Sequence, residues 1–135
     1  MNHTTATLRI PSEVDEIRVV QDAIMDRMHE AGFNGDSCFA VKLALEESLI
    51  NAVKHGNHFD PKRSVFVRYE ISPDCVRISV KDEGPGFDPE QVPDPTATEN
   101  LTKPSGRGIM LMRAYMDEVS YSDGGRNVTL VKKRR

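Results

Sequence analysis

Hydrophobic residues recur at steps of three and four over the first part of the chain. The positions are Val14, Ile17, Val20, Ile24, Met28 and Ala31. This spacing predicts an amphipathic helix over residues 13–31, and Gly32 would end it. Ser12, followed three residues later by Asp15, is close to a capping box, so we expect it to begin this helix. The preceding TATLRI alternates briefly between polar and apolar residues and predicts a first strand.

A second helix, predicted over roughly residues 37–55, carries two apolar stripes instead of one. The first stripe contains Val41, Leu45, Leu49 and Ala52, and the second contains Phe39, Leu43, Ile50 and Val53. The Asn34-Gly35-Asp36 turn before this helix offers a cap for it. Lys42 and Glu46, spaced i and i+4, fill one gap between the stripes and would form an ion pair in solvent.

Two later segments alternate between apolar residues and others. SVFVRYEI places Val65, Val67, Tyr69 and Ile71 on one face, and CVRISVKD does the same with Val76, Ile78 and Val80. The SPD turn between them predicts an antiparallel hairpin with one buried face. Further along, GRGIMLMRAYMDEVSYSD predicts a helix that leads into a strand. NVTLVKK, after the Gly124-Gly125 turn, predicts a last strand.

The segment from Glu83 to Ser105 has a different composition. It contains Pro85, Pro89, Pro93, Pro95 and Pro104, which is five of the eight prolines. A segment this long without regular structure is typical of a functional lid or a disordered loop. The whole order of elements predicts an α+β fold, a two-layer sandwich with helices on one face of a mixed, mostly antiparallel sheet. We expect residues 1–135 to form a single domain.

Composition narrows the classes of function. The chain is 38% hydrophobic and 29% charged, and its net charge of −3 gives no general attraction to nucleic acid or to acidic lipid. Cys38 and Cys75 lack the spacing of metal ligands, and two scattered cysteines fit a reducing compartment. The chain has no run of 18 apolar residues and no apolar signal segment near its start. We therefore expect a cytoplasmic protein without a membrane or a nucleic acid as direct partner.

Three polar residues occupy the other gap between the stripes of the second helix. Glu47, Asn51 and His55 lie there, on the same side as Ala40 and Ala44. A carboxylate and an amide framed by apolar residues and alanines predict a cavity at this side of the helix. A second solvated face, or a buried polar network that stabilises the helix, explains the same pattern. This stretch alone leaves the functional and the structural interpretation open.

Two glycine-rich turns carry further candidate chemistry. VKDEGPGFD ends a strand at Asp82, and the alternate glycines Gly84 and Gly86 would admit a flat ligand close to the main chain. The Asp82 carboxylate can accept a hydrogen bond from an exocyclic amino group such as that of adenine. SGRGIML opens a helix at residues 106–108, where free backbone N–H groups and the helix dipole suit a phosphate. Each motif alone is also typical of an ordinary turn or helix cap.

Together, and in this order, these motifs resemble the N, G1 and G2 boxes of the GHKL ATPase superfamily. The resemblance extends from about Leu8 to Lys132. It is closest to the small bacterial anti-sigma factors that are also serine protein kinases. EESLINAVKHGN resembles their Glu-x-x-x-Asn-Ala-x-x-His-Gly helix, DEGPGF their first glycine box, and GRGIMLMRAYMDEV their second. The resemblance implies the Bergerat, or histidine-kinase-like, ATPase fold.

The chain departs from the family pattern in two places. Pro104-Ser105 stand where some anti-sigma kinases carry an arginine that contacts the phosphates, so Arg107 or Lys103 would have to supply that charge. GGRN, at residues 124–127, stands where larger members of the superfamily have a glycine-threonine feature. Both departures concern charge and positioning around the phosphates and the base, on which phosphoryl transfer depends.

The resemblance implies a role for each matching residue. Asn51 would coordinate Mg²⁺, which prefers oxygen ligands and phosphates. Glu47 would be the catalytic general base that accepts the proton of an attacking serine or threonine hydroxyl. Asp82 would bind the adenine amino group, and Gly84 and Gly86 would leave room for the base.

Further ATP-binding roles follow from the same resemblance. Gly106, Arg107 and Gly108 would wrap the phosphates, and residues 87–105 would close over them as an ATP lid. Thr129, on the last strand, would reach the adenine end. His55 would line the pocket or cap its own helix.

The activity that the resemblance implies is that of an ATP- and Mg²⁺-dependent serine/threonine protein kinase and anti-sigma factor. Such a protein holds a sigma factor inactive and phosphorylates an anti-anti-sigma antagonist. Edge pairing of TATLRI would give a homodimer. A non-catalytic, ATP-dependent protein-binding switch of the same fold remains an alternative. The catalytic domain of a histidine kinase is a weaker one, because no upstream helix pair carries a phosphoacceptor histidine and His29 lies within the first helix.

Overall fold

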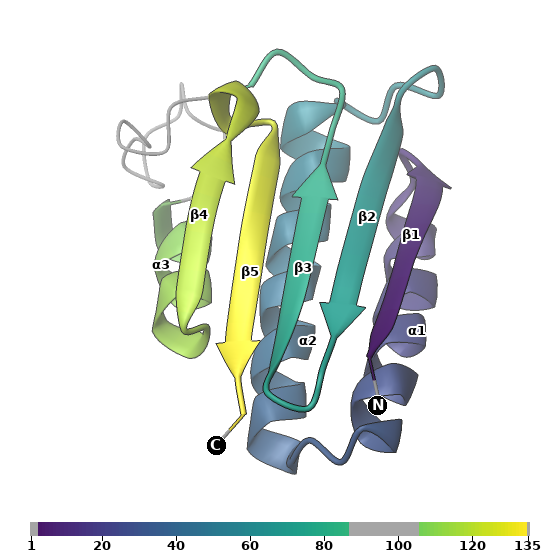
Figure 1. Ribbon diagram of the computed structural model, residues 1–135. Coiled ribbons are helices and arrows are strands. Elements are labelled where there is room, and N and C mark those ends of the chain that lie inside the picture. Colours follow the sequence, from purple (N-terminus) through teal and green to yellow (C-terminus); the bar gives the residue numbers. More distant parts are fainter. Residues whose placement is uncertain (1–2, 87–105, 135) are drawn as a thin grey trace.

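The computed structural model describes residues 3–86 and 106–134, and of residues 106 and 107 it describes the backbone alone. The elements follow the order that the sequence predicts (Figure 1). They are β1 (Thr4–Pro11), α1 (Ile17–Glu30), α2 (Gly35–Ile50), β2 (Ser64–Ile71), β3 (Cys75–Lys81), α3 (Gly106–Tyr115), β4 (Glu118–Ser122) and β5 (Asn127–Lys133). Short helical turns at η1 (Val14–Glu16), η2 (Asn51–Gly56) and η5 (Asp123–Gly125) complete the described chain.

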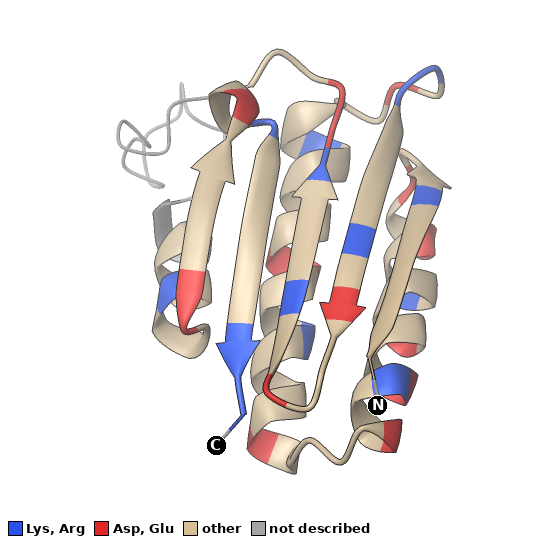
Figure 2. Cartoon of the chain, viewed as in Figure 1, with Lys and Arg blue, Asp and Glu red and all other residues tan. Residues whose placement is uncertain are grey.

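The strands form one five-stranded sheet in the order β1-β2-β3-β5-β4. Each of the four neighbouring pairs is antiparallel, so the described sheet contains no parallel pair and is not mixed. The three long helices lie behind one face of this sheet in Figure 1. The α+β sandwich is thereby confirmed. The opposite face is uncovered by helices and carries charged residues of both signs (Figure 2).

The core lies between the sheet and the helices. All alternating positions expected to be buried in the hairpin are buried, namely Val65, Val67, Tyr69, Ile71, Val76, Ile78 and Val80. The first apolar stripe of α2 is buried along its whole length, at Val41, Leu45, Leu49 and Ala52. Apolar surface removed from water is the main favourable term in folding, at about 25 cal/mol per Å². The periodicity of the sequence therefore places the helices against the sheet.

The predicted start of the first helix is wrong in its details. Residues Val14–Glu16 form a 3₁₀ turn before α1, and Val14 is 50% exposed instead of buried. Ser12 caps neither element, because its hydroxyl donates to the Arg63 carbonyl at 2.7 Å. The Ser12 hydroxyl, which a capping box would use, is instead hydrogen-bonded to a residue far away in the sequence. The C-terminal prediction is correct, since Gly32 follows α1 with a φ of 80°.

The second helix also departs from its prediction at two points. Its Asn34 cap is confirmed by a 2.8 Å bond from the Ser37 N–H to the Asn34 side chain. Phe39, expected in the second stripe, is 58% exposed, and its ring meets the edge of Tyr115 on α3 at 6.2 Å. The regular helix stops at Ile50, and η2 continues it as a wider π-helical turn. Single π turns within helices are frequent at functional sites.

Candidate functional site

Three separate stretches of chain meet around the end of α2. A Cβ atom added to Gly108, in the first turn of α3, would overlap the Glu47 carboxylate of α2. A Cβ atom added to Gly56, at the end of η2, would overlap the Asp82 carboxylate that follows β3. The structure thus brings together the helix and both glycine motifs, although they lie far apart in the sequence. Glu47 lies on α2 beside the first turn of α3, and Asp82 lies beside Gly56 at the end of η2, which continues α2.

The glycines of the first turn are required by close packing of main chain on main chain. A Cβ on Gly84 would overlap the Gly56 carbonyl, and a Cβ on Gly86 would overlap the Gly124 carbonyl. Gly86 also has a φ of 84°, a conformation that side chains disfavour. The turn is therefore pressed between η2 on one side and η5 on the other. This packing fixes the position of the carboxylate at Asp82.

Asp82 is a buried carboxylate, only 7% exposed. One of its oxygens accepts the Gly84 N–H at 2.8 Å, and its own N–H donates to the Arg126 carbonyl at 3.0 Å. Burial raises the pKa of the Asp82 carboxyl, and the Gly84 N–H and the Arg126 and Arg63 guanidinium groups offset part of the rise. A carboxylate has further acceptor sites, which an amino group of a ligand would fill. Buried groups with a shifted pKa are frequent at functional sites.

Asn51 carries the second sign of a ligand site. Its Nδ2 atom is buried, and no residue of the described chain accepts a hydrogen bond from it. Leaving a buried donor without an acceptor costs about 1–3 kcal/mol. A phosphate oxygen would satisfy this donor, while the side-chain oxygen of the same amide would suit Mg²⁺.

The described residues include no cluster of three or more His, Cys, Asp or Glu side chains able to hold a metal. A protein-only metal cage is therefore absent from that part of the chain. Mg²⁺ rarely needs such a cage, because it keeps several waters and binds through one or two protein oxygens plus phosphates. The side-chain oxygen of Asn51, together with the phosphates of a bound nucleotide, would suit this ion.

The remaining predicted site residues fall into three groups. His55 lies in η2, one turn beyond Asn51, and is half-buried. The backbone of Gly106 and Arg107 belongs to the first turn of α3, whereas the Arg107 side chain lies outside the described residues. The lid at 87–105, with Lys103 and Pro104-Ser105, also lies outside them.

Thr129 does not join the site. Its hydroxyl lies 3.3 Å from the Ser79 hydroxyl, directly across the β3–β5 pairing. The buried neighbours of Thr129, Val128 and Leu130, point toward the helices, so Thr129 points to the uncovered face. The expected contact of Thr129 with the adenine end is therefore wrong, because alternation along β5 turns this side chain away.

Three residues that contact the first glycine turn were not predicted. The Asp82 carboxylate packs against Gly56, as described above. Asn57 is fully buried and accepts the Glu83 N–H at 2.8 Å. Arg126 donates to the Gly84 carbonyl at 2.7 Å. Asn57 and Arg126 bind main-chain groups, and the only sequence signals for them are their places in HGN and GGRN.

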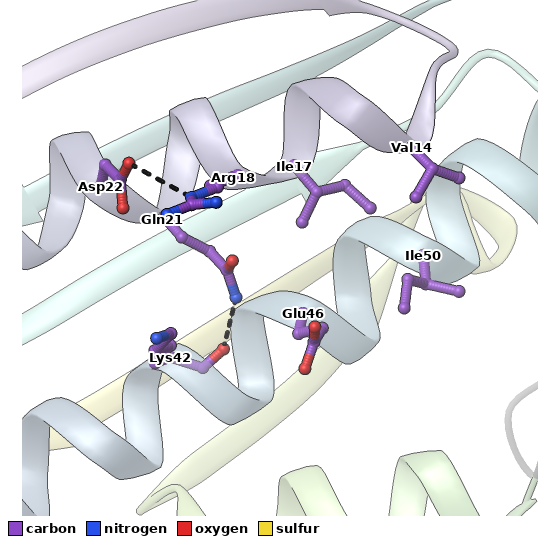
Figure 3. Close-up of a pocket in the computed structure, with 8 residues that line it drawn as sticks. All are labelled: Val14, Ile17, Arg18, Gln21, Asp22, Lys42, Glu46 and Ile50. Atoms are coloured by element: carbon purple, nitrogen blue, oxygen red, sulfur yellow. Dashed lines mark hydrogen bonds and ion pairs between the residues drawn. The ribbon is translucent and has the colours of Figure 1, made fainter.

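A separate groove lies on the other side of α2, between it and α1 (Figure 3). Its volume is about 350 Å³, and the Gln21 side chain crosses it to donate to the Lys42 carbonyl at 3.1 Å. Lys42 and Glu46 both line this groove (Figure 3), and the described chain shows no ion pair between them. The predicted Lys42–Glu46 pair is thus wrong, and the groove is distinct from the Glu47 and Asn51 side of the helix.

The fold and the arrangement of the two glycine motifs around α2 and η2 are those expected of a histidine kinase-like ATPase domain. Residues 10–132 match the family model of the histidine kinase-like ATPase domain, so the chain belongs to this family. The resemblance expected from the sequence is confirmed. In the described residues, no helix is long and apolar enough to cross a membrane.

Curated relatives within the family are serine-protein kinases named RsbW. The one from Bacillus velezensis is 29% identical over 132 residues, which is 93% of this chain and 82% of the relative. The one from Bacillus subtilis is 26% identical over 118 residues, 83% of this chain and 74% of the relative. The Listeria monocytogenes protein is 26% identical over 137 residues, 96% of this chain and 87% of the relative.

A solved structure has the same fold. It contains the RsbU and RsbW domains of a Mycobacterium tuberculosis protein, with a TM-score of 0.67 and 19% sequence identity. The match covers 98% of this chain and 32% of the length of that longer chain. At this identity the likeness concerns the fold alone.

Proposed function

We propose that this chain is an ATP- and Mg²⁺-dependent serine/threonine protein kinase that acts as an anti-sigma factor. The observation that carries the proposal is the meeting of Glu47, Asp82 and Gly108 around one helix that also carries Asn51. Family membership and the serine-protein kinase relatives support it. We include in the proposal that residues 1–135 act as one domain and work in the cytoplasm.

In this proposal the site binds ATP at two ends. Asp82 accepts a hydrogen bond from the adenine amino group, in a setting where burial strengthens the discrimination against a base that lacks this donor. Asn51, which lies between Glu47 and Gly56 along the chain, would hold Mg²⁺ and the phosphates. Residues 106–108 supply N–H groups at the start of α3 for the phosphates. Mg²⁺, when bound, neutralises phosphate charge and orients the triphosphate.

Glu47 is the proposed general base. It accepts the proton as the oxygen of a serine or threonine hydroxyl attacks the γ-phosphorus. The bond between that phosphorus and the bridging oxygen breaks, and ADP leaves with the electron pair. Gly108 leaves room for the Glu47 carboxylate beside the N-terminus of α3. Most of the rate enhancement in such a reaction comes from positioning and charge stabilisation.

The proposed protein partners are a sigma factor and an anti-anti-sigma antagonist that carries the phosphorylated hydroxyl. We also propose a homodimer through β1. This strand pairs with β2 on one side and is the last strand of the described sheet on the other. An edge strand presents unpaired N–H and C=O groups to a second copy.

The proposal is tested by phosphoryl transfer from labelled ATP to an antagonist protein encoded in the same genome. Wild type should bind ATP and label the antagonist on serine or threonine. Glu47→Gln should bind ATP normally and transfer at least about 100-fold more slowly. Glu46→Gln is the matched control, because Glu46 is exposed and faces the α1 groove. Its transfer rate should equal that of wild type.

Two results would change the conclusion. Undiminished transfer by Glu47→Gln would remove Glu47 from its role as base. Tight ATP binding by wild type, with no transfer to the antagonist but with nucleotide-dependent release of the sigma factor, would identify the non-catalytic switch instead.

A further inference from the structure

The first glycine turn, residues 82–86, is fastened on one side by Asn57. This side chain is fully buried. Its Oδ1 atom accepts the Glu83 N–H at 2.8 Å, and its Nδ2 group donates to the Ser12 hydroxyl and to the Ser64 carbonyl, each at 2.9 Å. Both N–H groups and the oxygen of the Asn57 side-chain amide are thus hydrogen-bonded, which fixes the orientation of the amide. Asn57 ties the turn to the ends of η2, β1 and β2.

Arg126 fastens the same turn on the opposite side. Its Nε atom donates to the Gly84 carbonyl at 2.7 Å, and its Nη2 atom donates to the Pro85 carbonyl at 3.0 Å. Its own carbonyl accepts the Asp82 N–H at 3.0 Å. The planar fork of a guanidinium can hold two carbonyls in one geometry, which an ammonium group cannot do.

The two side chains leave little freedom at the carboxylate. Asp82, Glu83, Gly84 and Pro85 each have a main-chain group held by Asn57, by Arg126 or by Asp82 itself. Gly86 is pressed against the Gly124 carbonyl. A site recognises its ligand sharply only when its polar groups are held within about 0.5 Å of the productive geometry.

We propose that Asn57 and Arg126 are positioning residues that set the base selectivity of the site. They hold the turn so that the Asp82 carboxylate meets the amino group of adenine and repels the carbonyl oxygen that guanine presents at the same place. This inference rests on the proposed nucleotide binding. Neither residue touches the base, and each acts through the main chain of the turn.

The test compares the affinities of wild type and variants for ATP and GTP, with Mg²⁺, by isothermal titration calorimetry. Wild type should prefer ATP. Arg126→Gln removes both carbonyl contacts and should reduce the ATP-to-GTP affinity ratio at least about tenfold. Arg126→Lys keeps the positive charge near Asp82 but lacks the fork, and it should lose selectivity as well. Asn57→Ser, which is too short to bridge the same partners, should behave alike.

Matched controls separate positioning from general loss of stability. The Arg134 side chain also donates only to main-chain carbonyls, those of Ala31, Gly32 and Pro73, but it lies at the other end of the sheet, next to the β2–β3 turn. Arg134→Gln should lower the melting temperature and leave the ATP-to-GTP ratio unchanged. Ser12→Ala removes one partner of Asn57 without freeing the Glu83 N–H, and it should also leave the ratio unchanged.

Each outcome is decisive. An unchanged ratio in Arg126→Gln overturns the inference while the proposed function stands, and this arm does not depend on the folding of the Asn57 variant. A ratio restored by Arg126→Lys shows that charge, not the fork, matters, and overturns it too. If wild type binds neither nucleotide, or if Asp82→Asn binds ATP as tightly as wild type, the proposed nucleotide site and this inference fail together.

Discussion

Replacing Gly56 by alanine tests whether the end of α2 and the first glycine turn form one site. The added methyl group would overlap the Asp82 carboxylate. The backbone itself tolerates alanine, because Gly56 is not among the glycines with positive φ. The whole penalty therefore comes from displacing Asp82, which would break its 2.8 Å bond from the Gly84 N–H.

The magnitude follows from two opposing effects. A hydrogen bond to a charged group contributes about 1.5–3 kcal/mol to stability. Replacing glycine by alanine at a compatible position returns about 0.4–1 kcal/mol through the unfolded state. We therefore expect Gly56→Ala to lower the free energy of unfolding by about 1–2 kcal/mol, or the melting temperature by about 3–8 °C. Its affinity for ATP should fall more than tenfold.

Gly35→Ala is the matched control for this experiment. Gly35 is the first residue of α2 and, like Gly56, lacks a positive φ, but a Cβ there would meet no atom within 4 Å. Thermal unfolding should show this variant to be as stable as wild type or slightly more stable, and calorimetry should show the same ATP affinity. If Gly56→Ala matches Gly35→Ala in both measurements, the close approach of Asp82 to η2 is refuted.

The remaining predictions concern charge, capping and the core. Because burial raises the folded-state pKa of Asp82, its contribution to stability is complete below its unfolded pKa and is lost as the pH rises through the folded value. Asp82→Asn lacks this titrating group, so the melting temperature of the variant relative to wild type should rise as the pH increases above about 4, the ordinary pKa of an Asp carboxyl. A difference that stays constant with pH would contradict the burial of the carboxylate. Asn34→Ala should cost about 1 kcal/mol in chemical denaturation, since it removes the cap of α2. Leu45→Ala, at a fully buried position, should cost about 2–5 kcal/mol, whereas Leu111→Ala, at a site 39% exposed, should cost under about 1 kcal/mol.

Periodicity predicts most of this fold because nearly every element has one buried face. The alternation in β2 and β3 and the first stripe of α2 correspond to side chains that pack between sheet and helices. Phe39 shows the limit of that reasoning. A stripe predicts burial only where another element covers it, and at Phe39 the neighbouring helix supplies one ring edge.

The periodicity of a regular α-helix does not predict the π turn at η2. A pattern of 3.6 residues per turn assumes that the helix continues unchanged, and it does not register the wider turn that begins at Asn51. Glu47 and Asn51 were still predicted on one side, because the turn between them is regular. The N–H of Asn51 donates to the Glu47 carbonyl.

The site residues that sequence reasoning missed share one property. Asn57 and Arg126 bind main-chain atoms of the turn. Because nearly every residue has the same main-chain groups, the identities of the turn residues do not indicate these contacts. Gly56 is likewise needed because of a carboxylate that comes much later in the chain. The opposite error, at Thr129, arose because the sequence alone did not fix which face of β5 meets the helices.

The most direct test of the account is a titration with ATP in the presence and absence of Mg²⁺. Wild type, Asn51→Ala and Asp82→Asn would be compared by calorimetry. The account predicts that wild type binds ATP more tightly with Mg²⁺, that Asn51→Ala loses this metal dependence, and that Asp82→Asn loses most of its affinity for ATP. Equal affinities in all three proteins would contradict the claim that these side chains surround one nucleotide.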